Sequence, residues 1–145
     1  MAAYLDTGLL IKIYVNEPDS AQALALVQSL SGPLLFTRFH RAEVVNTLRC
    51  KQGRRELTGA DVAKVLADIR ADLRSGFLLF RELDWSRVFA GAVRLSNAHA
   101  AKTLCRTLDA IHVAQALQLG AVQFATKDNR QCAFARAAGL KVLVP

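Results

Sequence analysis

Cysteine is scarce in this chain, and its placement excludes two kinds of stabilising site. The 145 residues include only three cysteines, Cys50, Cys105 and Cys132. Their number is odd, no two form a CxxC pair, and none has a histidine at zinc-ligand spacing. Neither a disulfide framework nor a zinc site is therefore expected. We predict reduced thiols that fill the hydrophobic core.

The sequence also lacks the long apolar run that a membrane protein needs. No stretch approaches the roughly 18 uncharged apolar residues of a membrane span. The N-terminal segment Met1 to Asp6 has no basic residue and reaches an acid at once, which is not typical of a signal peptide. We expect a cytoplasmic protein without a membrane partner. Its length and its 52% hydrophobic composition fit one globular domain over residues 1–145.

Acidic residues are few, 12 against 19 lysines and arginines, which gives a formal net charge of +7. A basic surface attracts polyanions and gains from the release of their counterions. Nucleic acid is therefore the leading class of partner. The same charge would also serve solubility alone, and composition does not decide between the two interpretations.

Short apolar runs alternate with longer amphipathic stretches, a rhythm that predicts an α/β fold with a twisted parallel sheet flanked by helices. The expected strands are Ala2 to Leu5, Leu34 to Phe36, Phe77 to Phe80, Val122 to Ala125 and Lys141 to Val144. The expected helices are Thr7 to Tyr14, Ala21 to Leu30, Arg38 to Lys51, Thr58 to Arg74, Trp85 to Ala98, Leu108 to Leu119 and Asn129 to Ala138.

Local signals mark several of the helix ends. Asp19 is expected to cap the second helix, and Thr58 the fourth, where Asp61 stands at the third position of a capping box. Gly120 and Gly139 are expected to stop the last two helices.

Four acids stand where the chemistry of such a fold would gather. Asp6 and Asp128 follow predicted strands, and ligands bind at the carboxyl ends of parallel strands. Glu43 and Asp109 lie next to apolar residues, where an isolated carboxylate is costly unless it is paired or bound to a metal. Plainer roles stay open. Asp6 and Asp128 would serve as helix caps, Asp109 as an acceptor of backbone N–H groups, and Glu43 as a partner of Arg38 or Arg41.

If the four carboxylates converge, their mutual repulsion calls for cations. Hard oxygen ligands suit Mg²⁺ or Mn²⁺, which also accept phosphate oxygens. Such a site can activate water and stabilise charge on a phosphodiester. The residues therefore point to hydrolysis of a nucleic-acid backbone.

The ordered segments resemble those of PIN-domain nucleases, specifically the toxin ribonucleases of the VapC type. The matching segments are Tyr4 to Tyr14, Arg41 to Asn46, Arg106 to Ala114, Thr126 to Asp128 and Ala138 to Leu140. A lone Leu-Asp-Thr would be weak, but this set comes in the family's order and spans residues 4–140.

The resemblance implies a metal-dependent endoribonuclease whose Mg²⁺ or Mn²⁺ is held by Asp6, Glu43, Asp109 and Asp128. It gives Thr126 a supporting role through its hydroxyl. It also implies a homodimer and a cognate antitoxin protein that blocks the site. One position departs from the pattern, because Gly8 stands where such proteins commonly carry Ser.

The densest positive segment surrounds Glu43, and we expect some of its arginines to steer RNA by phosphate contacts. The candidates are Arg38, Arg41, Arg54 and Arg55. A solvated helix face explains any single one equally well.

Two rival functions and one histidine complete the predictions. A PIN-like module that binds RNA or protein with weak or no catalysis stays open because of Gly8. A phosphatase with a covalent aspartyl phosphate needs a second acid two residues after Asp6, and that position is again Gly8. His112 is interpreted as a core histidine, since imidazole is not a ligand that Mg²⁺ prefers.

Overall fold

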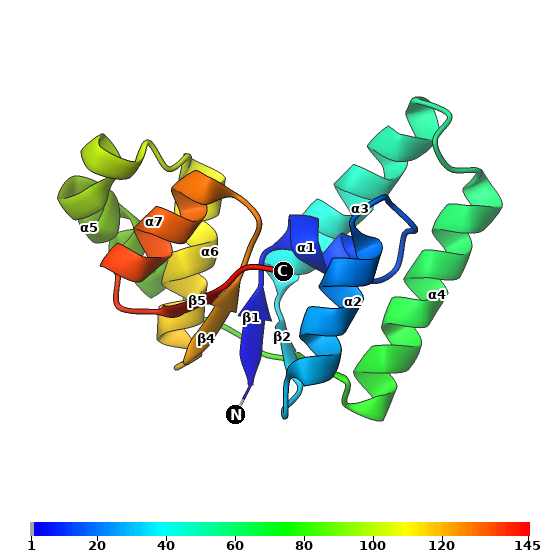
Figure 1. Ribbon diagram of the computed structural model, residues 1–145, viewed down its shortest axis with the longest axis horizontal. Coiled ribbons are helices and arrows are strands. Elements are labelled where there is room, and N and C mark those ends of the chain that lie inside the picture. Colours follow the sequence, from blue (N-terminus) through cyan, green and yellow to red (C-terminus); the bar gives the residue numbers. More distant parts are fainter. Residues whose placement is uncertain (1) are drawn as a thin grey trace.

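The computed structural model describes residues 2–145, which form seven helices and a five-stranded parallel sheet (Figure 1). The strands are β1 (Ala3–Leu5), β2 (Leu34–Phe36), β3 (Leu78–Phe80), β4 (Gln123–Ala125) and β5 (Lys141–Leu143). The helices are α1 (Thr7–Lys12), α2 (Ser20–Ser29), α3 (Arg38–Gly53), α4 (Gly59–Ser75), α5 (Trp85–Thr103), α6 (Thr107–Gln118) and α7 (Asn129–Ala137). The predicted α/β class is confirmed.

The order of the strands places β1 at the centre. The sheet runs β3-β2-β1-β4-β5, with Ala3 of β1 opposite Leu34 of β2 and Gln123 of β4. The chain moves outward from β1 to β3 and then returns to β4 on the other side of β1. This reversal makes a switch point between β1 and β4, and such points are where open parallel sheets bind ligands.

Both faces of the sheet are buried, which explains why the strands are short apolar runs. In β1, Ala3 and Leu5 pack on one face, while Tyr4 between them packs on the other. Phe124 and Ala125 of β4 divide between the faces in the same way. Successive side chains of a strand point to opposite faces, so each strand feeds two cores.

The two cores are covered by different helices (Figure 1). One contains residues of α1, α2, α3 and α4, with Leu48 fully buried in it. The other contains residues of α5, α6 and α7, with Phe134 fully buried. Within residues 2–145, no helix combines the length and the apolarity that a membrane crossing requires.

Several predicted helix ends are corrected by the structure. The first helix ends at Lys12 rather than Tyr14, and α5 continues five residues beyond Ala98, to Thr103. Asp19 occupies the N-cap position of α2, but its carboxylate makes no capping bond, because it accepts from Lys12 and Lys127 instead.

Other local predictions are confirmed. The capping box of Thr58 and Asp61 is present at the start of α4. Gly120 and Gly139 follow α6 and α7 with φ of 68° and 94°, a conformation in which a side chain would be strained. The three cysteines are free thiols, yet only Cys132 is buried, so the core prediction is wrong for Cys50 and Cys105.

Replacing Leu48 by Ala should lower the free energy of unfolding by about 2–5 kcal/mol, because truncating this fully buried side chain leaves a cavity. Leu24 on α2 is 42% exposed and gives a matched control, for which Leu24→Ala should cost far less. Urea unfolding followed by circular dichroism measures both values. Equal losses in the two variants would contradict this description of the core.

Candidate active site

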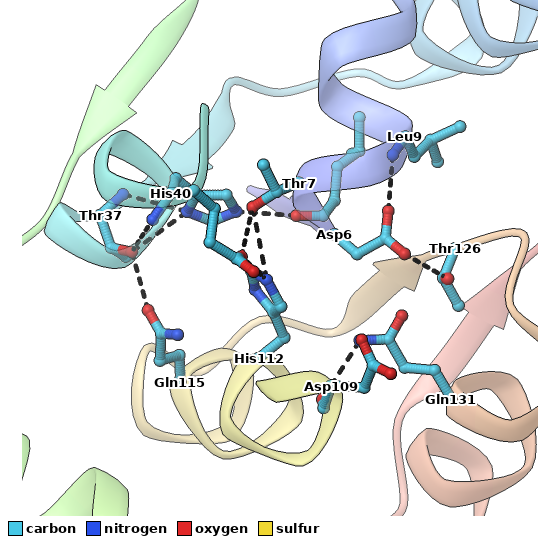
Figure 2. A network of polar contacts seen from close by, with 12 residues as sticks. Asp6, Thr7, Leu9, Thr37, His40, Asp109, His112, Gln115, Thr126 and Gln131 are labelled. Atoms are coloured by element: carbon cyan, nitrogen blue, oxygen red, sulfur yellow. Dashed lines mark hydrogen bonds and ion pairs between the residues drawn. The ribbon is translucent and has the colours of Figure 1, made fainter. Parts of the chain in front are cut away.

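Asp6 leaves the end of β1 and caps α1 at the switch point of the sheet. Its Oδ1 accepts from the backbone N–H of Leu9 at 2.7 Å, and its Oδ2 accepts from the hydroxyl of Thr126 at 2.5 Å (Figure 2). Burial raises the pKa of Asp6, and the negative charge of Asp109 acts in the same direction, against the two hydrogen bonds. Burial is therefore the main cost of keeping Asp6 ionised, and its two hydrogen bonds offset part of that cost.

Thr126 and Asp128 come from the loop after β4, the strand beside β1. The Thr126 side chain is fully buried, and its Oγ1 accepts from the backbone N–H of Asp128 at 3.0 Å. Asp128 caps α7 by accepting from the N–H of Gln131 at 2.8 Å. One hydroxyl thus connects the side chain of Asp6 to the backbone of Asp128.

Asp109 lies in the first turn of α6 and is paired with an arginine that the sequence did not single out. Its Oδ2 accepts from Nε of Arg106 at 3.2 Å, and Nη2 of Arg106 lies 3.9 Å from Oδ2 of Asp128. Burial together with the charges of Asp109 and Asp128 raises the pKa of the Cys105 thiol to about 12. The negative potential of this corner is only partly offset by the exposed Arg106.

Glu43, on α3, is held by partners that its sequence neighbours did not reveal. Its Oε1 accepts from the hydroxyl of Thr7 at 2.8 Å and contacts Nε2 of His112. Burial acts to raise the pKa of Glu43, but the hydrogen bonds from His112 and Thr7 outweigh it and lower the pKa. Pairing with Arg38 is not observed, because Arg38 binds Glu82 at 2.6 Å.

Two cavities meet at Glu43. One, of about 320 Å³, is lined by Glu43 and by residues of the first turn of α6, including Asp109 and Arg106. The other, of about 330 Å³, is lined by Glu43, Gly8 and Arg54 among others. Arg54, a predicted RNA-binding residue, thus shares a cavity with a candidate acid.

The other three predicted basic residues lie elsewhere. Arg41 lines a separate apolar cavity between α3 and α4, and Arg38 is engaged with Glu82. Arg55 is exposed in the turn after α3, where its φ is 61°.

Three polar side chains near the acids were missed by sequence reasoning. Thr7 directly follows Asp6, so the matched segment carried a signal for it. His40 carried none, yet its buried ring bonds the carbonyl of Leu5 at 2.8 Å, and burial lowers its pKa to about 3. Gln131 bonds the carbonyl of Asp109 at 3.1 Å, next to that residue in Figure 2, and its buried Oε1 has no hydrogen-bond partner among the described residues.

The donor types around this corner suit a divalent cation. Carboxylate oxygens are the ligands that Mg²⁺ and Mn²⁺ prefer, and the side chain of Gln131, which bonds the carbonyl of Asp109, has a buried oxygen without a donor. Within residues 2–145, however, no three Asp, Glu, His or Cys side chains are grouped closely enough to hold one ion. Each acid makes a hydrogen bond with a protein donor instead.

Gly8 is compatible with a side chain. A Cβ built there would lie 3.8 Å from Oδ1 of Asp6, an ordinary van der Waals contact, with no other atom within 4 Å. The missing hydroxyl therefore reflects no steric constraint in this structure.

Comparison with known proteins gives one family for nearly the whole chain. A family model for the PIN domain matches residues 3–140. The ribonuclease VapC46 of Mycobacterium tuberculosis is 32% identical over 153 residues, covering 99% of this chain and 98% of that protein.

Solved structures share the fold along their full lengths. VapC20 of Mycobacterium tuberculosis, a Sarcin-Ricin loop cleaving toxin, has a TM-score of 0.67 at 14% identity, with 99% of both chains covered. VapBC2 of Rickettsia felis, bound to a DNA fragment from its promoter, has a TM-score of 0.65 at 15% identity, with 99% and 98% covered. FitAcB of Neisseria gonorrhoeae has a TM-score of 0.60 at 19% identity, with 97% and 96% covered.

These structural likenesses support the fold, and the sequence matches support the family. The resemblance seen in the ordered acidic segments is confirmed by the family model, which spans all four acids, and by the full-length identity to a ribonuclease. The chain belongs to the PIN domain family.

Proposed function

We propose that this protein is a metal-dependent endoribonuclease and the toxin of a toxin-antitoxin pair. The observation that carries this proposal is the match to a ribonuclease of the VapC group over 99% of the chain. The match to the PIN family model also includes every candidate acid. The basic net charge of +7 agrees with a polyanionic substrate. RNA is the substrate class, and hydrolysis of a phosphodiester bond is the reaction.

The proposed metal ligands are Asp6, Glu43, Asp109 and Asp128, with Mg²⁺ or Mn²⁺ as the ion. Nucleases of this family generally use divalent metal. When bound, the ion polarises the phosphodiester and activates the attacking water. The hydroxyl of Thr126 supports the site, because it fixes one oxygen of Asp6 relative to the loop that carries Asp128.

Arg106 contacts two of the proposed metal ligands. Its guanidinium contacts Asp109 and Asp128 and offsets part of their repulsion while no ion is bound. The side chain of Arg106 is 72% exposed, so these contacts stabilise the fold little and are readily exchanged for an ion.

The proposed partners are an antitoxin protein, an RNA substrate and a second copy of this chain. VapBC2 and FitAcB, two structures with this fold, support an antitoxin partner. The homodimer and a cytoplasmic location remain predictions.

Replacing Asp6 by Asn should lower metal-dependent RNA cleavage by more than about 100-fold, since losing even an outer partner of a metal ligand costs 10–100-fold. Folding should persist, because Asn caps a helix as well as Asp does. Asp84→Asn, at the N-cap of α5, is the matched control and should keep full activity.

The assay uses total RNA with Mg²⁺, Mn²⁺ or EDTA, and a filter-binding measurement of RNA affinity runs beside it. If a folded Asp6→Asn variant cleaves RNA as fast as the wild type, the assignment of Asp6 as a metal ligand is refuted. Metal-independent RNA binding without cleavage by the wild type would favour the binding module.

Replacing Gly8 by Ser should tighten Mn²⁺ binding, because the new hydroxyl would add a polar group near Asp6 in a space that accepts a side chain. Gly8→Ala is the matched control, since it brings the same Cβ and a similar gain in helix propensity without the hydroxyl. Isothermal titration with Mn²⁺ separates the two. Equal affinities for Ser and Ala would show that the hydroxyl has no role.

Reversing the charges of Arg54 and Arg55 to Glu should weaken RNA binding and flatten its dependence on salt by about one unit of slope per lost phosphate contact. The double variant Arg70→Glu with Arg74→Glu on α4 changes the net charge equally and is the control. Affinity is measured at several KCl concentrations. If both double variants behave alike, only net charge matters, and Arg54 and Arg55 make no specific contact.

A further inference from the structure

The imidazole of His112 is buried and has a hydrogen-bond partner at each nitrogen. The residue is 2% exposed, which confirms its interpretation as a core histidine. Its Nδ1 lies 2.7 Å from the hydroxyl of Tyr4, and its Nε2 contacts Oε1 of Glu43. The hydroxyl of Thr7 lies 3.3 Å from the same Nε2. Burial requires partners for both ring nitrogens, and one of these partners is a candidate metal ligand, Glu43.

The partners dictate where the ring carries its proton. A carboxylate only accepts hydrogen bonds, so the nitrogen facing Glu43 must be the donor, Nε2–H. The opposite nitrogen, Nδ1, lies within hydrogen-bond distance of the Tyr4 hydroxyl, a group that can donate or accept. Hydrogen bonds therefore connect Tyr4 through His112 to Glu43.

Three elements of the fold hold these hydrogen-bonded residues in place. Tyr4 lies in β1, His112 in α6 and Glu43 in α3. The ring of Tyr4 is fully buried and stacks on Phe124 with centroids 5.5 Å apart. The edge of the His112 ring meets Phe39 at 4.9 Å. The imidazole therefore has little freedom to rotate without losing its packing.

The hydrogen bonds to Glu43 are confined to one of its oxygens. Both Thr7 and His112 contact Oε1, while Oε2 makes no hydrogen bond within residues 2–145. Glu43 also lines a cavity together with Asp109. The carboxylate is thus anchored through one oxygen, and the other is left available for a ligand.

We propose that His112, itself held by Tyr4, is a positioning residue that orients Glu43 for the divalent metal. This inference rests on the proposed function. Outer partners that orient a metal ligand fix its geometry and raise its affinity for the ion. Neither Tyr4 nor His112 touches the ion or the RNA; both act through Glu43.

The test compares three variants of the full chain. His112→Leu removes the donor and should weaken Mn²⁺ binding by about 10–100-fold, while His112→Gln retains an N–H at a similar reach and should recover part of the loss. Tyr4→Phe removes only the hydroxyl and should weaken binding less. Tyr14→Phe is the matched control, because Tyr14 donates to Asp72 at 2.6 Å on the other side of the sheet and should leave Mn²⁺ affinity unchanged.

NMR spectroscopy tests the hydrogen bonds of the His112 ring directly, in the absence of metal. The ¹⁵N chemical shifts of the His112 ring in the labelled protein should show a proton on Nε2, the nitrogen that faces Glu43, and Tyr4→Phe should shift the Nδ1 signal, whereas Tyr14→Phe should not. An Nε2 without a proton would overturn the proposal, as would wild-type Mn²⁺ affinity in a folded His112→Leu variant.

Failure of this inference differs from failure of the proposed function. If the wild type binds Mn²⁺ and Asp6→Asn does not, while His112→Leu binds normally, only the positioning role is wrong. If the wild type and Asp6→Asn show the same lack of Mn²⁺ binding, the metal site and the positioning role both fall.

Discussion

The cost of burying carboxylates at the switch point of the sheet is the constraint that organises this corner of the molecule. Burial raises the pKa of Asp6, and the charge of Asp109 acts in the same direction. Three of the acids have side-chain hydrogen-bond donors: Thr126 for Asp6, Arg106 for Asp109, and Thr7 with His112 for Glu43. Because buried charges are stable only when they are paired, the hydrogen-bond network is a condition for keeping these acids there.

The fold supplies the rigidity that such a site needs. Strands of three residues are held by burial on both faces, and the central strand β1 ends directly at Asp6. Its neighbour β4 ends just before Thr126, and the backbone N–H of Asp6 bonds the carbonyl of Ala125 at 3.0 Å. The two segments that carry Asp6 and Asp128 are therefore held by the sheet as well as by the hydroxyl of Thr126, and parallel sheets build precise sites from such loops.

The successes and the errors of the sequence interpretation both have physical causes. The strands were placed within one residue because buried parallel strands are continuous apolar runs. The predicted end of α5 at Ala98 is too early, because no helix-breaking residue follows it. Ala100 and Ala101 favour helix, and the helix continues until Leu104 adopts a left-handed conformation with φ of 56°. The sequence leaves pairing of Glu43 with a local arginine open, but Arg38 instead reaches Glu82, 44 residues away.

The sequence by itself determined the order and type of the elements and the family, because hydrophobic periodicity and ordered motifs are local properties of the chain. It also predicts which four acids form the site. Only the tertiary structure decided what each acid touches. Thr126 is 120 residues from Asp6, and His112 is 69 residues from Glu43. Hydrogen bonds act over about 3 Å, so such partners exist only once the sheet has brought β1, β4, α3 and α6 together.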